Sequence, residues 1–343
     1  MRAIRIHEHG GPEAMRLDEV PDPVPGPGEV LVEVGAAGIN HLDVFVRRGM
    51  PGVTIPLPRI LGADAAGVVA VLGDGVTAPA VGTRVLLYPA TYCGACDLCE
   101  SGDASMCGRY RIYGEHADGT YAEKVVARAD NAIPIPDGWT FAEAASVPLV
   151  FVTAWRMLIT RGRLKPGEDV LILGAGSGVG SACVQIARLV GARVWATASS
   201  EEKQERARAL GAEVIVPYER FDKFVRDRTG RRGVDVVVDY VGKDTWTTSL
   251  RALRQGGRIL TCGATTGFDP TDDLRHIFFR QLEVIGSTMG SRTELKQVLK
   301  HLFDGRLRAV VDRVVPLAQA AEAHRLIEAR QVFGKVVLDC GTV

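Results

Sequence analysis

The chain of 343 residues is longer than the length at which a single hydrophobic core usually stops growing, so we expect two domains. Its 41 basic and 41 acidic residues balance to a formal net charge of zero, which offers no bulk attraction for nucleic acid or an anionic membrane surface and favours small-molecule partners. No apolar run approaches the roughly 20 residues of a membrane-spanning helix, and the first residues do not resemble a signal peptide, so we expect a cytoplasmic protein.

Residues 1–150 are rich in glycine, proline and valine and contain short apolar runs such as EVLVEVGAAGI, AAGVVAVLG and TRVLLYPA. Turn residues separate these runs, a pattern that predicts a β-rich domain with few helices. One short helix is expected from His41 towards Arg47. Asn40 could cap its start, and Asp43 would then be an ordinary acid of its first turn.

Four cysteines follow the spacing C-x2-C-x2-C-x7-C, which fits a closed structural zinc site with four thiolate ligands. They are Cys93, Cys96, Cys99 and Cys107, and we expect them to hold one structural zinc ion per chain in a lobe at residues 90–112. The other three cysteines lie in apolar surroundings, so metal ligation with buried thiols fits better than a set of disulfides. The alternative is that the four thiols carry no metal or are oxidised.

From residue 165 onwards the sequence alternates between strand and helix patterns. The strand candidates are DVLILG, ARVWATAS, EVIV, VDVVVDYVG and GRILTCG, and LEVIGSTMG would close the sheet. Repeated βα units imply a parallel, doubly wound sheet, so the fold class is α/β.

The end of the chain carries two helical patterns, TELKQVLKHLFDG and AQAAEAHRLIEAR, followed by a strand pattern, GKVVLDC. We expect this segment to return to the first domain. The expected division is therefore a β-rich domain over residues 1–150, a parallel-sheet domain over residues 151–288, and a return segment over residues 289–343 that completes the first domain.

A glycine-rich turn, GAGSGVG, directly follows the apolar strand VLIL and opens an apolar-periodic helix. Glycines in such a turn let a pyrophosphate approach the backbone N–H groups at a helix N-terminus, so we expect a dinucleotide here. The strict G-x-G-x-x-G register fails, because a valine stands where the third glycine should fall. The predicted contacts are Gly174, Gly176, Ser177, Gly178 and Val179.

The end of the second strand, RVWATAS, carries no acid to bind the ribose 2′-hydroxyl of NAD. The missing carboxylate removes repulsion towards a 2′-phosphate, while Ser199, Ser200 and Lys203 could supply hydroxyl donors and a positive charge. NADP is therefore favoured, with NAD as the alternative. Lys203 could instead be an exposed helix cation, and the neighbouring Glu201 and Glu202 weaken its attraction for phosphate.

With the cysteine lobe, the turn GAGSGVG and the order of the two domains, nearly the whole chain resembles the medium-chain dehydrogenase/reductase family, which includes zinc alcohol dehydrogenases and quinone oxidoreductases. The resemblance implies a GroES-like catalytic domain, a Rossmann domain and an active site in the cleft between them. It also implies a homodimer or homotetramer, usually joined through the edge strands of the Rossmann sheets.

Further cofactor contacts follow from the resemblance to quinone oxidoreductases. Tyr218 lies fifteen residues after Lys203, a spacing that this branch shows between two residues at the adenosine phosphate, and Arg330 matches a basic residue that reaches the same phosphate. Three residues that follow strands should line the nicotinamide side, namely Val241, Gly263 and Ala264. The alternatives are a surface position for the first two residues and strand-end packing for the other three.

Zinc alcohol dehydrogenases carry three catalytic ligands, and this chain departs from their pattern at each of them. Asn40 stands in the place of the first cysteine, Ala63 in that of the histidine, and Leu149 falls near the third ligand. Because neither Ala63 nor Leu149 can donate electrons to a metal, a catalytic zinc of the usual kind is not expected. An unorthodox site of Asn40, His41 and Asp64 stays open.

The resemblance then implies an NAD(P)H-dependent reductase of quinones or enones that works without catalytic zinc, and Asn40 matches an asparagine that faces the nicotinamide in quinone oxidoreductases. Hydrogen bonds from Asn40 and His41 could stabilise the charge left by hydride transfer, with Asp43 as a further site residue and Tyr113 or water returning the proton. Capping, packing or surface roles are the alternatives for these residues. An alcohol dehydrogenase and a cofactor-binding protein with negligible turnover are the alternative functions.

Overall fold

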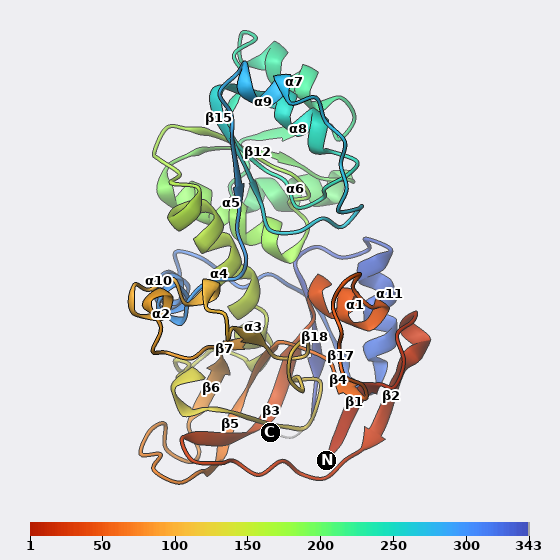
Figure 1. Cartoon of the computed structure of the whole chain (residues 1–343), viewed down its shortest axis with the longest axis vertical. Helices are drawn as coiled ribbons and strands as arrows, with labels where there is room; N and C mark the ends of the chain where they lie inside the picture. The colour runs from red at the N-terminus through yellow and green to blue at the C-terminus, as the bar shows by residue number, and fades with distance from the viewer. Residues whose placement is uncertain (342–343) are drawn as a thin grey trace. The chain divides into compact units, whose positions relative to one another are not determined.

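The computed structural model describes residues 1–341 and forms two compact units. The first, here called the β-rich unit, comprises residues 1–149 and 291–295 and the C-terminal segment from Ala309. The second, here called the parallel-sheet unit, comprises Val150–Gly290 and Lys296–Arg308. Figure 1 shows the elements of both units along the chain.

The division differs from the expected one by one or two residues at positions 150 and 289–290 and, over a longer stretch, in residues 296–308, all of which lie in the parallel-sheet unit. The contacts explain the difference. The ring of His301 stacks on Trp155 at 5.4 Å, and the Arg308 backbone bonds to the Gln185 side chain. Helix α10 (Arg292–Phe303) therefore begins in one unit and ends in the other.

The β-rich unit is built on a seven-stranded sheet in which β10, β6, β5, β3, β18 and β17 are neighbours in that order and β9 also pairs with β3. A three-stranded sheet has the order β2-β1-β4, and β7 pairs with β8. The strand bounds are β1 Arg2–Ile6, β2 Met15–Glu19, β3 Glu29–Gly38, β4 Arg59–Ile60, β5 Asp64–Leu72, β6 Arg84–Leu87, β7 Ala90–Thr91, β8 Arg111–Ile112, β9 Lys124–Arg128, β10 Ala132–Pro134, β17 Val311–Pro316 and β18 Lys335–Asp339.

The helices of the β-rich unit are short. Their bounds are α1 His41–Arg48, α2 Asp97–Glu100, α3 Phe141–Ala145 and α11 Ala320–Glu328, with 3-10 turns η1 Pro12–Ala14, η2 Ala104–Met106, η3 Ala129–Asn131 and η5 Leu317–Gln319. Helix α11 and strand β18 confirm the predicted helix and strand near the C-terminus. Strand β18 pairs antiparallel with β3, so the C-terminal segment joins the seven-stranded sheet of the β-rich unit.

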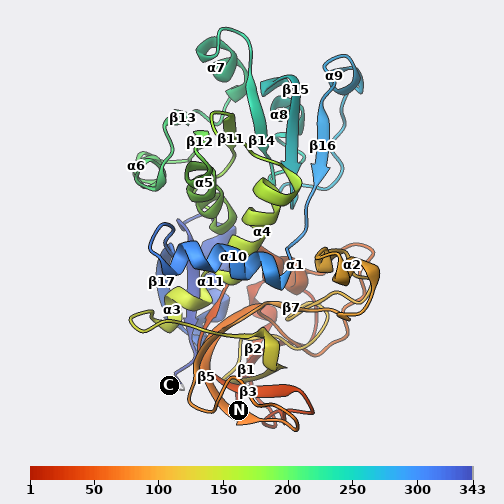
Figure 2. The same ribbon diagram turned by 90° about the vertical axis from the view of Figure 1, so that its left-hand side faces the viewer.

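The parallel-sheet unit carries six parallel strands in the order β13-β12-β11-β14-β15-β16 (Figure 2). The strand bounds are β11 Asp169–Ile172, β12 Arg193–Thr197, β13 Val214–Val216, β14 Val234–Val238, β15 Leu253–Thr261 and β16 Glu283–Gly286. The helix bounds are α4 Pro148–Trp155, which begins two residues before this unit, the π-helix η4 Arg156–Arg161, α5 Gly178–Val190, α6 Glu201–Leu210, α7 Phe221–Arg228, α8 Trp246–Ala252 and α9 Arg275–Phe278.

This strand order confirms the Rossmann sheet, with β16 as its last strand, as predicted. The central strands β11 and β14 are wholly buried because helices α5 and α8 pack on them. The strand order reverses between β11 and β14, and ligands of such sheets bind beyond the carboxyl ends of the strands at that point. In residues 1–341 no helix combines the length and the apolar character needed to cross a membrane.

Candidate functional site

The glycine-rich turn lies at the switch point, between β11 and α5, where the sequence places a dinucleotide. Gly174 adopts a left-handed φ of 64°, which turns the chain, and the hydroxyl oxygen of Ser177 caps α5 by accepting the Gly180 N–H at 2.9 Å. Within the described residues, the N–H groups of Gly176, Gly178 and Val179 donate to no protein acceptor. Three unpaired N–H groups at a helix N-terminus form an anion site suited to pyrophosphate.

Gly180 fills the role of the third glycine, one residue later than the strict register expects. A Cβ atom there would lie 2.3 Å from the carbonyl oxygen of Gly174 and 2.5 Å from the hydroxyl of Tyr240. Only glycine therefore allows α5 to begin so close to the end of β11. The sequence analysis did not assign this role to Gly180, because the turn is one residue longer than the strict G-x-G-x-x-G motif.

The turn is also held by Thr197 at the end of β12, a contact that the sequence did not predict. Thr197 is fully buried, and its hydroxyl oxygen accepts the Gly174 N–H at 2.8 Å while its carbonyl accepts the Ala175 N–H at 3.0 Å. These two bonds fix the first half of the turn before the free N–H groups begin.

The loops that carry the predicted nicotinamide contacts are held by a buried acid at the end of β14. Asp239 is fully buried and accepts hydrogen bonds from the N–H groups of Val241 and Gly242 at 2.9 and 3.0 Å and from two further hydroxyls. The N–H of Thr266 donates to the Val241 carbonyl at 2.8 Å. Val241 thus lies in the same bonded assembly as the loop that follows Gly263 and Ala264.

The residues predicted to contact a 2′-phosphate begin directly after β12. Ser199 and Ser200 are exposed, and the Ser200 hydroxyl caps α6 by accepting the Lys203 N–H at 3.3 Å. Tyr218 is 41 % exposed. Arg330 belongs to the β-rich unit, where it follows α11, and its pairing with this group stays a prediction.

A buried polar cluster in the β-rich unit joins the start of α1 to β5 and β18. The Asn40 amide nitrogen donates to Asp64 at 2.9 Å, and its oxygen accepts from the Lys335 ammonium at 2.5 Å. Lys335 also lies 3.3 Å from Asp64, whose second oxygen accepts the Leu149 N–H at 2.9 Å. Burial lowers the pKa of Lys335 and raises that of Asp64, while their mutual attraction opposes both shifts.

This cluster lies beside the three positions at which the resemblance to zinc alcohol dehydrogenases places catalytic ligands. Asp64 brings Asn40 and Leu149 together, and Ala63 directly precedes it. Ala63 and Leu149 offer no lone pair, the Asn40 oxygen is bound to an ammonium group, and that positive charge would repel a dication. The residues present do not fit a catalytic zinc of that kind.

Hydrogen bonds within the protein compete with the predicted role of Asn40 as a donor to substrate. Its second amide hydrogen faces the Gly38 carbonyl at 3.4 Å, so both hydrogens have protein acceptors. Asn40 also stands at the N-cap position of α1, where its backbone N–H donates to the Asp43 carboxylate at 2.7 Å. A bond from this amide to substrate would replace one of these contacts.

Asp43 is a buried acid at the end of a chain of hydrogen bonds. Its carboxylate accepts the Tyr121 hydroxyl at 2.7 Å, and the tyrosine oxygen lies 3.4 Å from Nε2 of His324. Arg47 donates to Nδ1 of His324 at 3.0 Å, so the neutral ring carries its proton on Nε2 and donates towards Tyr121. Burial raises the pKa of Asp43 to about 6 and lowers that of His324 to about 3.

His41 differs from the other two predicted catalytic residues because its side chain reaches the surface. Its ring meets the Phe45 ring edge-on at 5.9 Å. Desolvation by neighbouring atoms lowers the pKa of His41, Glu328 opposes this shift, and Arg330 and Arg48 add to it, so the ring is neutral near pH 7. Tyr113, by contrast, packs in the core of the β-rich unit, where burial raises its pKa to about 12.

The four predicted zinc ligands converge in the lobe formed by α2 and η2. Their sulfur atoms all lie within 4.8 Å of one another, with Cys93 and Cys99 at 3.7 Å and Cys96 and Cys99 at 3.5 Å. A tetrahedral zinc with bonds of about 2.3 Å would separate its sulfurs by about 3.8 Å. The donor set therefore fits a closed structural zinc site.

The pKa values of two of these thiols shift in opposite directions. The Ala95 N–H donates to the Cys93 sulfur at 3.5 Å and lowers the pKa of this thiol to about 6, which favours the thiolate. Packing against its neighbours instead raises the pKa of Cys99 to about 12. A bound dication would favour the thiolate form of the coordinating cysteines.

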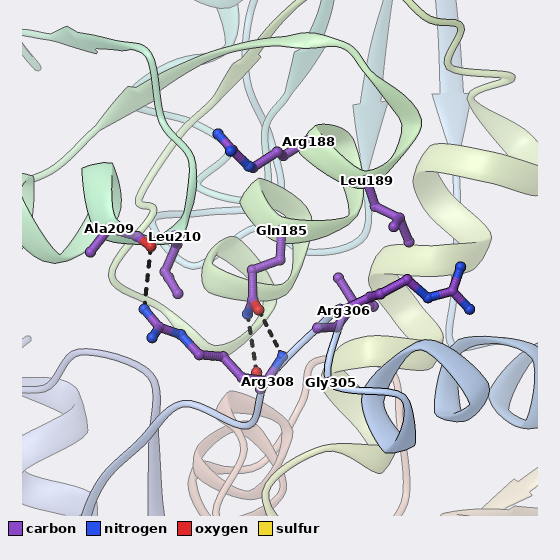
Figure 3. A pocket seen from close by; sticks show the side chains of 9 residues that line it. Gln185, Arg188, Leu189, Ala209, Leu210, Gly305, Arg306 and Arg308 are labelled. Atoms are coloured by element: carbon purple, nitrogen blue, oxygen red, sulfur yellow. Dashed lines mark hydrogen bonds between the residues drawn. The ribbon is translucent and has the colours of Figure 1, made fainter.

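A separate cavity of about 460 Å³ lies in the parallel-sheet unit, at the carboxyl ends of α5 and α6 (Figure 3). Arg188, Arg306 and Arg308 line it, and the guanidinium of Arg308 donates to the Ala209 carbonyl at 3.3 Å. Helix carboxyl ends carry partial negative charge, which cations stabilise. Arg308 thus compensates the carboxyl end of α6, and none of the predicted site residues lines the cavity.

Comparison with known proteins gives matches to two domain models, the alcohol dehydrogenase GroES-like domain over residues 26–137 and the zinc-binding dehydrogenase domain over residues 178–304. An alcohol dehydrogenase of Geobacillus stearothermophilus is 34 % identical over 98 % of this chain and 99 % of its own. An acryloyl-coenzyme A reductase of Sulfurisphaera tokodaii is 30 % identical over 98 % of this chain and 99 % of its own.

A quinone oxidoreductase of Rattus norvegicus is 30 % identical over 98 % of this chain and 97 % of its own. Among solved structures, an NAD-dependent alcohol dehydrogenase is 48 % identical, with a TM-score of 0.95 over 99 % of this chain and all of that one. Because both domain models match and relatives of this identity span nearly its whole length, the chain belongs to the medium-chain dehydrogenase/reductase family and is an oxidoreductase.

Proposed function

We propose that this protein is an NAD(P)H-dependent reductase of quinones or of activated alkenes such as enones, and that it works without a catalytic metal. The observation that carries the proposal is the buried Lys335–Asn40–Asp64 cluster beside the positions of the absent zinc ligands. Without a metal to lower the pKa of an alcohol, oxidation of simple alcohols has no accessible alkoxide. Hydride transfer to a conjugated acceptor needs less assistance, because the negative charge spreads to a distant oxygen.

A bound dihydronicotinamide supplies the hydride. Such a group would deliver the hydride to the β-carbon of an enone or to a quinone, and the displaced π electrons would leave a negative charge on a carbonyl oxygen of the substrate. His41 donates an N–H hydrogen bond to that oxygen, and water supplies the proton that completes the reduction. His41 is neutral near pH 7, so it acts first as a hydrogen-bond donor.

We propose NADP as the preferred dinucleotide. The end of β12 offers Ser199 and Ser200 and no carboxylate, and Lys203 follows one turn into α6. Because NAD serves the structural neighbour, the choice needs a direct measurement. Binding of NADPH at least tenfold tighter than that of NADH would support the proposal, and an S199D variant should reverse the preference by repelling the 2′-phosphate.

We further propose one structural zinc ion in the lobe of Cys93, Cys96, Cys99 and Cys107, which ties this part of the chain together and takes no part in the reaction. A homodimer joined along the edge strand β16 is also proposed, because this strand has a free edge and exposed apolar residues nearby. The free thiols are in keeping with the reducing cytoplasm, where we place the enzyme.

The deciding experiment combines metal analysis with activity. The purified protein should contain one zinc per chain and should consume NADPH with quinones or enones, at rates that an EDTA treatment does not lower. Two zinc ions per chain, together with chelator-sensitive oxidation of simple alcohols, would instead identify an alcohol dehydrogenase. Dinucleotide binding without turnover on either panel of substrates would identify a binding protein.

A further inference from the structure

Tyr240 is a buried residue that no sequence motif singled out, and it contacts both halves of the predicted dinucleotide site within the parallel-sheet unit. It directly follows Asp239 after β14 and is 9 % exposed. Its side chain points to the glycine-rich turn, and its backbone meets the loop that carries the predicted nicotinamide contacts.

The phenol group is bonded to two positions of the turn. Its hydroxyl donates to the Gly174 carbonyl at 3.0 Å and lies 3.0 Å from the Ser177 hydroxyl. A carbonyl can only accept, so the single phenol proton goes to Gly174, and the Ser177 hydroxyl must donate to Tyr240. The Ser177 oxygen in turn accepts the Gly180 N–H at 2.9 Å.

These bonds form one continuous path from the first glycine of the turn to the start of α5. The path uses both the proton and an oxygen lone pair of Ser177, so the serine hydroxyl has no proton left for a pyrophosphate oxygen. Phosphate recognition then depends on the backbone N–H groups of Gly176, Gly178 and Val179, whose directions the path holds fixed.

The backbone of Tyr240 meets the second half of the site. Its carbonyl accepts the Thr265 N–H at 3.2 Å, and a Cβ atom on Gly263 would lie 3.6 Å from the Tyr240 Cβ. Gly180 packs against the phenol oxygen of Tyr240, and a Cβ atom at this position would lie only 2.5 Å from that oxygen. One residue therefore joins the pyrophosphate turn to the nicotinamide-side loop.

We propose that Tyr240 is a positioning residue for the dinucleotide, which fixes the pyrophosphate turn through Ser177 and Gly174 and sets its distance from the loop at Gly263. The proposal rests on dinucleotide binding at this turn. It assigns to the phenol hydroxyl an effect on cofactor affinity that acts through Gly174 and Ser177.

The test compares dinucleotide binding by the full-length protein and its Tyr240→Phe variant, which keeps the ring and loses only the hydroxyl. We expect the Kd for NADPH, measured by its fluorescence, to rise about tenfold, because the turn loses the bond that fixes two of its residues. The value of kcat at saturating NADPH should stay within about twofold of the wild type, since no reacting atom is involved.

Ser177→Ala removes the other end of the same path and should raise the Kd similarly. Because both substitutions break one path, the double variant should bind hardly worse than either single variant. The matched control is Tyr88→Phe, which removes a buried phenol bonded to Tyr110 at 2.9 Å in the β-rich unit. Its Kd for NADPH should not change, whatever its effect on thermal stability.

A Tyr240→Phe protein with an unchanged or tighter Kd would overturn the proposal, including the case in which only its Tm falls, which would show a purely structural role. Additive effects in the double variant would also overturn it. If the wild-type protein bound neither NADPH nor NADH, the proposed function would fail as well, whereas normal binding with an unaffected variant would refute the Tyr240 inference alone.

Discussion

His41 is the predicted catalytic residue whose side chain the fold leaves open to a substrate, since Asn40 and Asp43 are buried and bonded. Replacing His41 with alanine should lower kcat/KM for an enone or quinone about 10–100-fold, because the developing oxyanion loses a hydrogen-bond donor. His41→Gln keeps an N–H donor and should recover part of the loss. The Kd for NADPH should stay unchanged in both variants, and an alanine variant with wild-type kcat/KM would contradict the assigned role.

Lys335 should matter most for stability, because its ammonium compensates the fully buried Asp64 carboxylate. Lys335→Met leaves that charge unpaired and should lower the free energy of unfolding by about 3–5 kcal/mol in urea denaturation. The double variant with Asp64→Asn removes both charges and should regain most of the loss. A single variant as stable as the wild type would mean that water or a rearrangement already compensates Asp64.

His324 should make the protein sensitive to acid. Its pKa is about 3 in the fold against 6.5 for an ordinary histidine, so as the pH falls below 6.5 the unfolded chain binds a proton that the folded chain does not. The resulting loss of stability is about 2 kcal/mol between pH 6.5 and 5 and is absent above pH 6.5. Urea denaturation of His324→Gln should show a smaller loss over that range.

Protonation of Asp43 changes the stability in the opposite direction to that of His324. This contribution is the same in the wild type and in the His324→Gln variant. The pKa of Asp43, about 6 in the fold, lies above that of the unfolded chain, so protonation between pH 6 and 4 favours the folded state. The wild type minus variant difference therefore isolates His324. An equal loss of stability in both proteins would show that His324 is protonated in the folded state.

At the scale of single elements, the junction of β11 and α5 depends on Gly180. Gly180→Ala should abolish detectable NADPH binding, because the new Cβ would press on the Gly174 carbonyl at 2.3 Å and on the Tyr240 hydroxyl. Gly286→Ala, in β16, is the matched control, since a Cβ there meets no atom within 4 Å. Fluorescence titration checks both variants, and tight NADPH binding by Gly180→Ala would show that the turn tolerates a wider junction.

The elements were largely predictable because their signals are local. The βα alternation, the turn GAGSGVG and the cysteine spacing each lie within a short stretch, and all three match the structure. Gly180 was overlooked because a rigid motif register assigns its role to Val179. Tyr240 was overlooked because its contacts lie 60 residues or more away in sequence at Gly174 and Ser177, so no local pattern reveals them.

The same reason explains why the polar cluster of the β-rich unit escaped prediction. Lys335 lies 295 residues from Asn40 and 271 from Asp64, and only the antiparallel pairing of β18 with β3 brings them together. The sequence showed which ligands were missing at Ala63 and Leu149, but not which charge stands near them. The unit to which residues 296–308 belong could not be predicted either, because the pattern of an amphipathic helix does not show which unit the helix packs against.

At the scale of the whole molecule, the parallel sheet ends in an edge strand that is suited to a second copy. β16 is the last strand of the sheet, and Val284 on it is 46 % exposed. Nearby on and after α9, Phe278 and Phe279 are 58 and 67 % exposed and their rings lie 4.4 Å apart. An exposed strand edge beside apolar side chains is prone to pair with another chain, and a twofold axis lets β16 pair with its own copy.

The proposed homodimer predicts that light scattering after size exclusion gives twice the chain mass for the wild type. Val284→Lys places a charge on the pairing edge and should shift the protein towards the monomer at micromolar concentration. Val314→Lys is the matched control, because Val314 is 48 % exposed and lies on β17, at the end of the other large sheet. If the Val314 variant dissociated and the Val284 variant did not, the interface would lie on the β-rich unit instead.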